Sequence, residues 1–234
     1  MIEPNRHYST IRSLFLVLTS LPLVWQLRHF LIPLPPNLFA ELAHCFGHTS
    51  IILLIMALAI TPLRRWLTFG FTQAKIKWGK RLADWNFLIR LRRPIGVCSF
   101  LYMVLHIITY LYLELGFSLN EFIYEIQYRK FILPGLLAAI IMTMLALSSP
   151  TSTRRKLGRN WRRLHRSMYV LCLLSAFHYL WFAKATEMLP WFYLGLIIIF
   201  LMHRILTHSI EKLSCPDDTG MEVNRVGKKP QKNS

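Results

Sequence analysis

The sequence predicts an all-α protein, a polytopic membrane bundle of about six transmembrane helices. Three observations predict this class. Of the 234 residues, 54% are hydrophobic and 17% are charged, whereas an ordinary soluble domain has about 25% charged residues. Six separate apolar stretches also approach the ~20 residues that one membrane crossing needs. These predicted spans are 13–34, 42–62, 95–115, 131–149, 166–183 and 189–209.

The basic residues predict the orientation of these spans. The chain has 28 Lys and Arg residues and a net charge of +17. With a cytoplasmic N-terminus, all but Arg28, Arg129, Lys130 and Lys184 fall on the cytoplasmic side. This is the positive-inside pattern, and it predicts that the N- and C-termini are both cytoplasmic. We expect no nucleic-acid partner, because the basic clusters border membrane spans and contain no recognition motif.

The chain divides into three expected parts. They are a cytoplasmic N-terminus (1–12), a transmembrane domain (13–210) and a cytoplasmic tail (211–234) whose polar composition predicts disorder. The first span exceeds the apolar region of a signal peptide, about 7–15 residues, so we expect it to be retained. No separate soluble domain of ordinary size fits in the remaining segments.

Proline residues predict the ends of the first three spans. Pro33 closes the first span, Pro62 lies at the cytoplasmic end of the second, and Pro94 opens the third. The connection 63–93 mixes aromatic and basic residues. That composition suits a segment lying in the membrane interface, and it also suits a flexible basic loop.

Histidines within the later spans are the candidate functional residues, because ionisable groups inside a membrane are costly. His106 lies midway along the third span, His178 lies in the outer half of the fifth, and His165 begins the fifth. Imidazole ligates iron, and paired histidines on facing helices can hold a haem that transfers electrons. The alternative is that each ring only forms a hydrogen bond with a neighbouring helix.

The spacing of His165 and His178 raises a geometric question. Thirteen residues correspond to ~20 Å along a helix, a separation that suits two stacked haems. The same thirteen residues turn the helix by about 220° beyond three full turns, so the two rings would not share a face. Either a π-bulge or kink separates them, or His165 points elsewhere.

The other histidines and the cysteines give weaker signals. His44 and His48 are one turn apart at the outer start of the second span, a spacing that can bind a metal, but no third ligand is nearby. The four cysteines form no C-x-x-C pair, and three of them lie within predicted spans. We interpret them as small apolar residues.

Three segments carry a more specific signal than composition does. They are ITPLRRW at 60–66, RRPIGVCSFLYMVLHIITYLYLELG at 92–116, and RRKLGRNWRRLHRSMYVLCLLSAFHYLW at 154–181. These segments resemble the MsrQ family, the haem-binding membrane subunit of the periplasmic protein-methionine-sulfoxide reductase system. That family is part of the ferric-reductase-like transmembrane superfamily. The resemblance covers all six predicted spans.

The resemblance implies one or two b-type haems and a set of residues that hold them. His106 and His178 match the ligands of the outer haem, and His165 matches an inner ligand. His44 matches a family pattern and is a candidate contact at the haem edge. Arg92 and Arg93 stand where the superfamily has an inner partner ligand, and they can pair with haem propionates, a flavin phosphate or anionic lipid.

The resemblance also implies a function. The chain would be the electron-transfer subunit of an oxidoreductase in the bacterial inner membrane, with FMN as a second cofactor. Electrons would come from the quinone pool or a flavin reductase. They would pass to a periplasmic molybdopterin-dependent methionine sulfoxide reductase, which performs the catalysis. The chain contains no G-x-G-x-x-G motif, so a nicotinamide donor would have to be a separate protein.

Two other functions remain open from the sequence. One is a stand-alone ferric or quinone reductase of the same superfamily. The other is a transporter whose histidines relay protons or bind a metal, which the unbroken midspans and the absence of duplicated halves disfavour. For the electron-transfer function, we expect the partner to contact the outer loops 34–41, 115–130 and 184–190.

Overall fold

A computed structural model describes residues 8–26, 28, 37–76, 79–184 and 186–214. Within these ranges every regular element is a helix and there is no strand, which confirms the all-α class. The last part of the predicted tail, 215–234, and residues 34–36 of the predicted loop 34–41 lie outside the described residues. The division of the chain into three parts stays a prediction.

The six predicted spans overlap six helices, although residues 27 and 29–34 of the first span lie outside the described residues. These are α1 (Tyr8–Gln26), α2 (Leu38–Gln73), α3 (Asn86–Thr109), α5 (Ile132–Leu147), α8 (Met168–Phe182) and α9 (Leu189–Ser214). In the described part of the chain, four helices are long and apolar enough to cross a membrane alone, namely α1, α2, α3 with its flanking short helices, and α9. A fifth candidate is the pair of α4 (Leu119–Tyr128) and α5, which is bent by 115°.

Two of the predicted spans are shorter than expected. Helix α5 has 16 residues and α8 has 15, fewer than the ~20 that cross a bilayer. Helix α8 is extended at its start by α7 (Arg159–Arg166), with only Ser167 between them. Helix α6 (Thr151–Leu157) precedes α7, and Gly158 joins the two with a φ of +49°. A positive φ is a conformation that glycine adopts without steric cost.

The expected helix ends at Pro62 and Pro94 are wrong, because both prolines lie inside longer helices. Helix α2 continues to Gln73, and α3 begins at Asn86 after a short 3-10 helix, η2 (Leu82–Trp85). A proline removes the hydrogen bond to the carbonyl four residues earlier, and another donor can replace it within a membrane bundle. The hydroxyl of Tyr8 donates to the carbonyl of Arg90, the one that Pro94 leaves free, at 3.1 Å.

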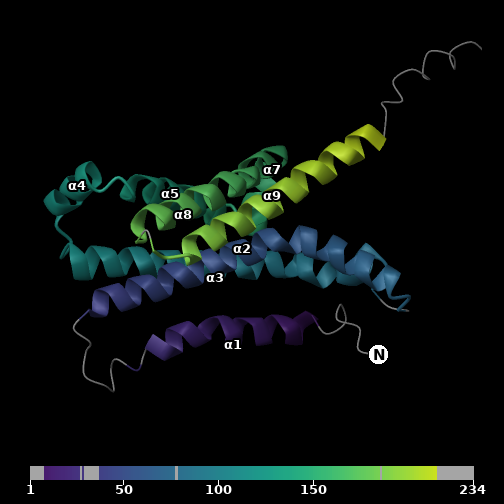
Figure 1. Cartoon of the computed structure of the whole chain (residues 1–234), viewed down its shortest axis with the longest axis horizontal. Coiled ribbons are helices and arrows are strands. Elements are labelled where there is room, and N and C mark those ends of the chain that lie inside the picture. The colour runs from purple at the N-terminus through teal and green to yellow at the C-terminus, as the bar shows by residue number, and fades with distance from the viewer. Residues whose placement is uncertain (1–7, 27, 29–36, 77–78, 185, 215–234) are drawn as a thin grey trace, which may run out of the picture.

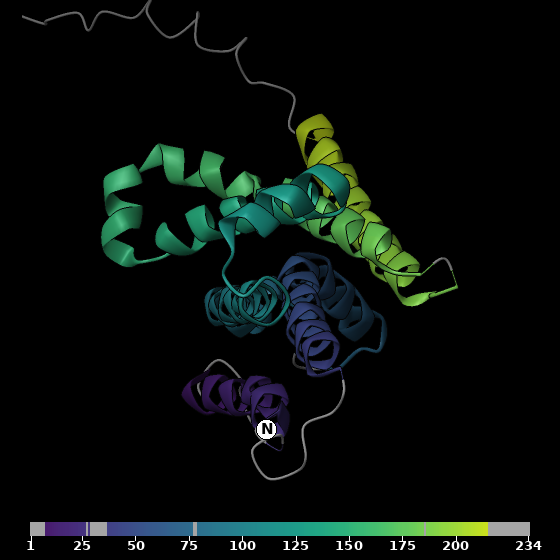
Figure 2. The same ribbon diagram turned by 90° about the vertical axis from the view of Figure 1, so that its left-hand side faces the viewer.

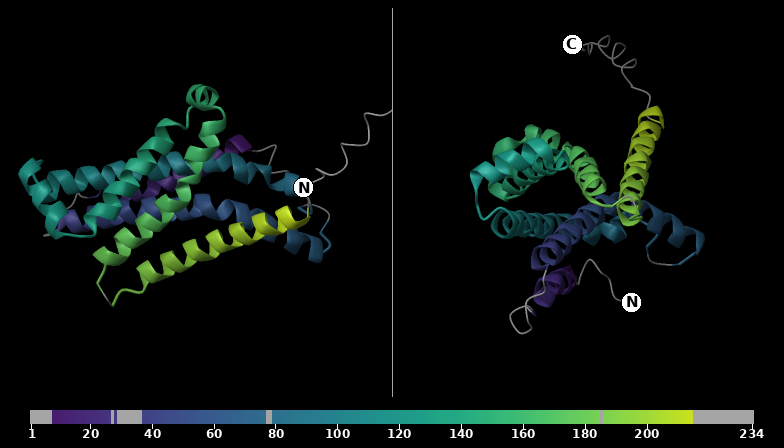
Figure 3. Two further views of the ribbon diagram at one scale, coloured as in Figure 1. Left: turned by 90° about the horizontal axis from the view of Figure 1, so that it is seen from above. Right: turned by 60° about the vertical axis from the view of Figure 1, so that its left-hand side comes forward.

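The helices are arranged around two antiparallel pairs. Helix α2 packs along α3, and α5 packs along α8. Helix α1 lies on one side of the first pair, while α5, α8 and α9 lie on the other (Figure 1), as the end-on view of Figure 2 also shows. Helix α9 contacts both α8 and α2, and it runs along the direction of α2 in the left panel of Figure 3.

Apolar side chains fill the interior and also cover the surface. Ile51, Leu58, Leu171, Ala176 and Ile197 form part of one core between α2, α5, α8 and α9. Many large apolar side chains point outward instead, as Val17, Leu18 and Trp25 of α1 do, each at least 60% exposed. An apolar exterior is unfavourable in water and is expected for helices that face lipid.

The two ends of the bundle differ in charge. We call the end that holds Arg64, Arg92, Arg204 and α7 the basic end, and the end that holds α4 the acidic end. At the acidic end a π-helix, η3 (Tyr110–Glu114), follows α3 directly, and α4 then occupies most of the segment expected to be a loop. Ser118 caps α4 by accepting a hydrogen bond from the backbone amide of Glu121 at 3.3 Å.

A small polar network fixes α4 to its neighbours. The carboxylate of Glu125 accepts hydrogen bonds from the hydroxyl of Tyr110 at 3.0 Å and from Nε of Arg129 at 2.8 Å. Its side chain is only 12% exposed. Arg129 also lies 3.9 Å from the carboxylate of Glu114. Glu125 therefore has a structural role, whereas Glu121 is exposed.

Candidate functional site

The rings of His106 on α3 and His178 on α8 face each other where the two helix pairs meet. Their centroids are 6.3 Å apart and their planes are inclined by 80°. The two residues are separated by 72 positions in the sequence, so only the packing of the α2–α3 pair against the α5–α8 pair brings them together. The structure thus places the two predicted outer ligands side by side.

This separation suits two imidazoles on opposite sides of one metal ion. An imidazole nitrogen binds a transition metal at about 2 Å and lies roughly 1.1 Å from its own ring centroid, so two such rings would have centroids about 6 Å apart. No group of three or more His, Cys, Asp or Glu side chains in the described ranges could hold a metal ion. Two imidazoles are sufficient for a haem iron, because the porphyrin supplies the other ligands.

The ring of His106 is held by the backbone of α2. Its Nδ1 lies 2.9 Å from the carbonyl oxygen of Ala43. Four residues later, Gly47 leaves room for the ring, because a Cβ at that position would lie 3.2 Å from Nδ1 of His106. We call such a combination of a carbonyl and a glycine four residues later a ring seat.

The ring of His178 occupies a second ring seat at the start of α5. Its Nδ1 lies 2.8 Å from the carbonyl oxygen of Phe131, and Gly135 follows four residues later. A Cβ at Gly135 would lie only 2.6 Å from Nδ1 of His178, a distance that real side chains do not tolerate. Each helix pair therefore holds one imidazole in the same way.

The ring seats determine which nitrogen is free. A carbonyl oxygen only accepts hydrogen bonds, so Nδ1 of each ring must carry the proton. Neither Nε2 atom has a hydrogen-bond partner among the described residues, and each keeps its lone pair. Histidines that bind a metal commonly donate their second ring N–H to a backbone carbonyl, which fixes the ring orientation. His106 and His178 thus have the neutral donor nitrogens with which they would hold a haem iron.

His44 and His48 lie next to this pair on α2. Their ring centroids are 4.0 Å apart with the planes inclined by 35°, but Nε2 of His48 lies 2.6 Å from the hydroxyl of Tyr179. That hydrogen bond connects α2 to the residue that follows His178. His44 is exposed and follows Ala43 directly, so it borders the ring seat of His106. A haem-edge contact for His44 stays a prediction.

His165 lies at the other end of the bundle and is not paired with a histidine there. Its ring stacks on Trp161, with centroids 4.0 Å apart, and the indole of Trp161 donates to the carbonyl of Ser148 at 3.2 Å. Nδ1 of His165 is buried without a hydrogen-bond partner in the part of the chain that the structure describes. The helix between His165 and His178 is interrupted at Ser167. A haem-ligand role for His165 stays a prediction.

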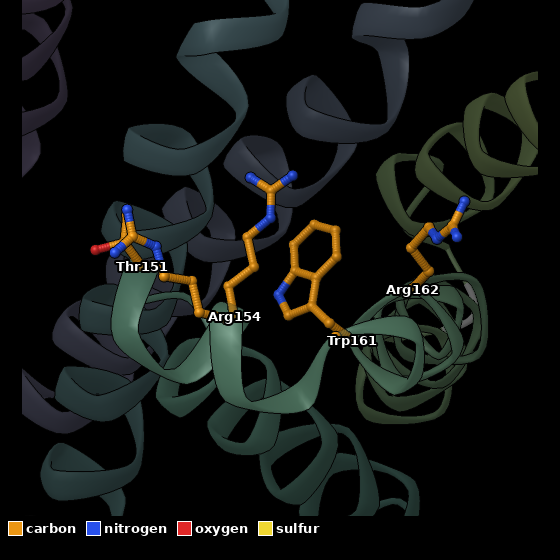
Figure 4. A pocket seen from close by; sticks show the side chains of 6 residues that line it. Thr151, Arg154, Trp161 and Arg162 are labelled. Carbon is orange, nitrogen blue, oxygen red and sulfur yellow. The ribbon is translucent and has the colours of Figure 1, made fainter.

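A surface hollow of about 440 Å³ lies beside Trp161, between α6 and α7. Figure 4 shows Arg154 next to Trp161 and Arg162 further along α7. The guanidinium carbon of Arg154 lies 4.5 Å from the centre of the Trp161 ring, a cation–π contact. The side chains of Arg154 and Arg162 are exposed, so this hollow is a feature of the surface.

The two arginines predicted as cofactor contacts lie in different surroundings. Arg92 is half-buried and donates from Nη2 to the hydroxyl oxygen of Thr61 on α2. Arg93 is exposed. Arg92 precedes His106 by fourteen residues on α3, which is ~21 Å along the helix. A role of either arginine at a cofactor stays a prediction.

Comparison with known proteins identifies the same region of the chain. Residues 46–176 match the family model described as "Ferric reductase like transmembrane component". The chain is also 32% identical over 205 residues to the protein-methionine-sulfoxide reductase heme-binding subunit MsrQ of Azospira oryzae, covering 86% of this chain and 81% of that relative. The matched family region contains His106 and His165, Gly47, and the ring seat of Phe131 with Gly135, whereas Ala43 and His178 lie just outside its two ends.

Proposed function

The chain belongs to the MsrQ family of ferric-reductase-like membrane proteins, and from this premise we propose that it binds haem b between His106 and His178. Family membership makes the chain the membrane electron-transfer subunit of a redox system. Haem, when bound, supplies reversible one-electron chemistry. The observation that carries the proposal is the pair of facing imidazoles, 6.3 Å apart.

The protein would contribute to this chemistry by orienting the two histidine rings and by excluding water from them. The ring seats of Ala43 with Gly47 and of Phe131 with Gly135 fix the orientation of both rings and leave both Nε2 atoms free to bind a metal. Phe131 also lies beside His178, with ring centroids 6.0 Å apart. The apolar exteriors of the helices support a position of the pair within the hydrocarbon region, where water is scarce.

We place the basic end of the bundle at the cytoplasm and the acidic end in the periplasm of a bacterial inner membrane. The support is the distribution of Lys and Arg, because cytoplasmic segments carry the excess of basic residues. In this orientation the His106–His178 pair lies toward the periplasmic side and His165 toward the cytoplasmic side. Electrons would leave near α4.

The electron donor and acceptor follow from the family. We propose a quinone or a flavin reductase as the donor, with FMN as a second cofactor, and a periplasmic molybdopterin-dependent methionine sulfoxide reductase as the acceptor. The acceptor is supported by the similarity to the Azospira oryzae protein, the heme-binding subunit of a protein-methionine-sulfoxide reductase. The catalysis on methionine sulfoxide would belong to the partner.

The visible spectrum of the purified protein tests this proposal. We expect the dithionite-reduced minus oxidised difference spectrum to show b-type haem, and we expect His106→Ala and His178→Ala each to lose it. His203→Ala on α9 is a matched control, since His203 lies against Trp66 with ring centroids 5.4 Å apart, away from the pair. Wild-type protein without haem, or retention of full haem content by both alanine variants, would overturn the proposal.

A further inference from the structure

Three arginines from three different helices converge at the basic end. Nη2 of Arg92 on α3 and Nη1 of Arg204 on α9 both donate to the hydroxyl oxygen of Thr61 on α2, the second at 3.5 Å. Arg64 lies one turn after Thr61 on α2. Arg92 is close enough to both Arg64 and Arg204 for electrostatic interaction. We call Arg64, Arg92 and Arg204 the arginine cluster.

The hydrogen-bond acceptors that the structure gives this cluster are all neutral. Arg64 donates to the carbonyl of Leu82 at 2.6 Å and to the side-chain oxygen of Asn86 at 3.0 Å. The guanidinium of Arg204 lies over the ring of Tyr169, 4.9 Å from its centroid. Within the described residues, none of the three guanidinium groups forms an ion pair with a carboxylate.

Two hydrogen-bond donors of the arginine cluster lack an acceptor among the described residues. The Nε atoms of Arg64 and Arg92 are both buried without a hydrogen-bond partner in the part of the chain that the structure describes. A buried donor without a partner is costly, and three like charges brought together away from bulk water repel each other. A bound anion would remove both costs at once.

We propose that Arg64, Arg92 and Arg204, with the hydroxyl of Thr61, form a binding site for a phosphate group. Guanidinium groups bind phosphate through paired, charge-assisted hydrogen bonds, and several of them can surround its oxygens. Basic pockets between transmembrane helices on the cytoplasmic side are suited to anionic lipid head groups. The phosphate belongs either to an anionic phospholipid or to a phosphorylated cofactor.

This site is separate from the histidine pair. Arg92 and His106 lie on the same helix, ~21 Å apart along its axis. The cluster is also separate from the surface hollow of Figure 4, whose arginines belong to α6 and α7 and are exposed. Neither the proposal nor its test therefore depends on whether haem is bound.

Thermal unfolding of the delipidated full-length protein in detergent tests the proposal. Short-chain phosphatidylglycerol, FMN and inorganic phosphate are the three probes, with zwitterionic phosphatidylcholine as the lipid control. We expect one of the three probes to raise Tm of the wild type. Stabilisation by phosphatidylglycerol but not FMN identifies a lipid, and the reverse identifies a cofactor.

Single substitutions on two helices locate the site. We expect Arg92→Gln and Arg204→Gln each to weaken the response, with a roughly ten- to hundredfold higher Kd. Without any probe, Arg92→Gln should unfold no more easily than the wild type, because it removes repulsion. A purely structural arginine would show the opposite. Arg162→Gln is the control, since it removes an exposed arginine from the same end.

Three results would overturn the proposal. One is that no phosphate probe stabilises the wild type. Another is that both cluster variants respond as the wild type does. The third is that Arg162→Gln loses the response while the cluster variants keep it, which would assign the phosphate to the surface hollow. If one cluster variant does not fold, the other on its separate helix still decides.

Discussion

Gly135 and His178 approach so closely that a methyl group on the glycine would lie 2.6 Å from Nδ1 of the imidazole. Such a distance forces the ring to move, because the neighbouring carbonyl of Phe131 holds Nδ1 at 2.8 Å. The glycine is therefore part of the means by which the protein fixes the ring of His178 beside that of His106.

Gly135→Ala is expected to reduce haem content while the helix remains intact. Turning a side chain away from its preferred rotamer costs about 0.5–1.5 kcal/mol, which corresponds to roughly two- to tenfold weaker binding. Haem per chain, measured from the absorbance of the purified protein, checks this. Gly47→Ala should have a smaller effect, because its Cβ would lie 3.2 Å from the ring of His106.

Gly195→Ala is the matched control for both glycine variants. A Cβ at Gly195 on α9 would meet no atom within 4 Å, and alanine is the better helix former. We expect full haem content and equal or higher thermal stability. If Gly135→Ala binds haem as well as Gly195→Ala does, the ring seat of Phe131 and Gly135 does not position His178.

His165→Ala is expected to leave the haem between His106 and His178 in place. His165 is thirteen residues from His178, ~20 Å along the helix, and its ring contacts Trp161. Quantified haem per chain and the redox titration of the variant check this. A stoichiometric loss of one of two haems would instead assign an inner haem to His165.

Glu125→Gln is expected to destabilise the acidic end. The substitution removes a charge-assisted hydrogen bond to Arg129 and alters one to Tyr110, and hydrogen bonds to charged groups contribute about 1.5–3 kcal/mol. Thermal unfolding in detergent measures the loss. Glu121→Gln, four residues earlier on the same helix, should change the free energy of unfolding by no more than about 0.5 kcal/mol.

Glu121→Lys tests whether α4 meets the electron acceptor. Glu121 is exposed, so reversing its charge should leave haem content unchanged and slow electron delivery to a partner that docks there. The rate at which the dithionite-reduced protein is reoxidised by the purified partner is the measurement. An unchanged rate at low ionic strength would exclude this face of α4 from the contact.

Tyr8→Phe is expected to cost about 0.5–1.5 kcal/mol in unfolding free energy, because the carbonyl of Arg90 would lose its donor. The double variant Tyr8→Phe with Pro94→Ala gives a sharper comparison. Alanine at 94 restores a backbone N–H that can bond to Arg90. The cost of Tyr8→Phe should therefore shrink in the Pro94→Ala background, and an equal cost in both backgrounds would contradict the compensation.

The sequence sufficed to predict the class of fold and to single out the histidines. Apolar length identifies spans, and an ionisable side chain inside one stands out against its neighbours, as His106 and His178 do. Helix ends were predicted less well, because Pro62 and Pro94 were treated as boundaries. In a membrane bundle, donors from other helices can compensate a proline, so proline alone does not mark an end.

The surroundings of the histidines depend on packing and could not be predicted. Nothing in the sequence relates Gly135 to His178 or Gly47 to His106 until the helix pairs are known. The same holds for the arginine cluster. Arg92 is a candidate contact from the sequence, but its neighbours Arg64 and Arg204 come from two other helices, α2 and α9, while the adjacent Arg93 is exposed.

Each of the two facing imidazoles belongs to a different antiparallel helix pair. A group that binds both nitrogens therefore bridges the two helix pairs. Its binding free energy would stabilise the packing of the two helix pairs against each other, because the group binds only when both pairs are in place. Binding of the cofactor would then complete the assembly of the bundle. Chains without the cofactor would be less stable and therefore more exposed to proteolysis in the cell.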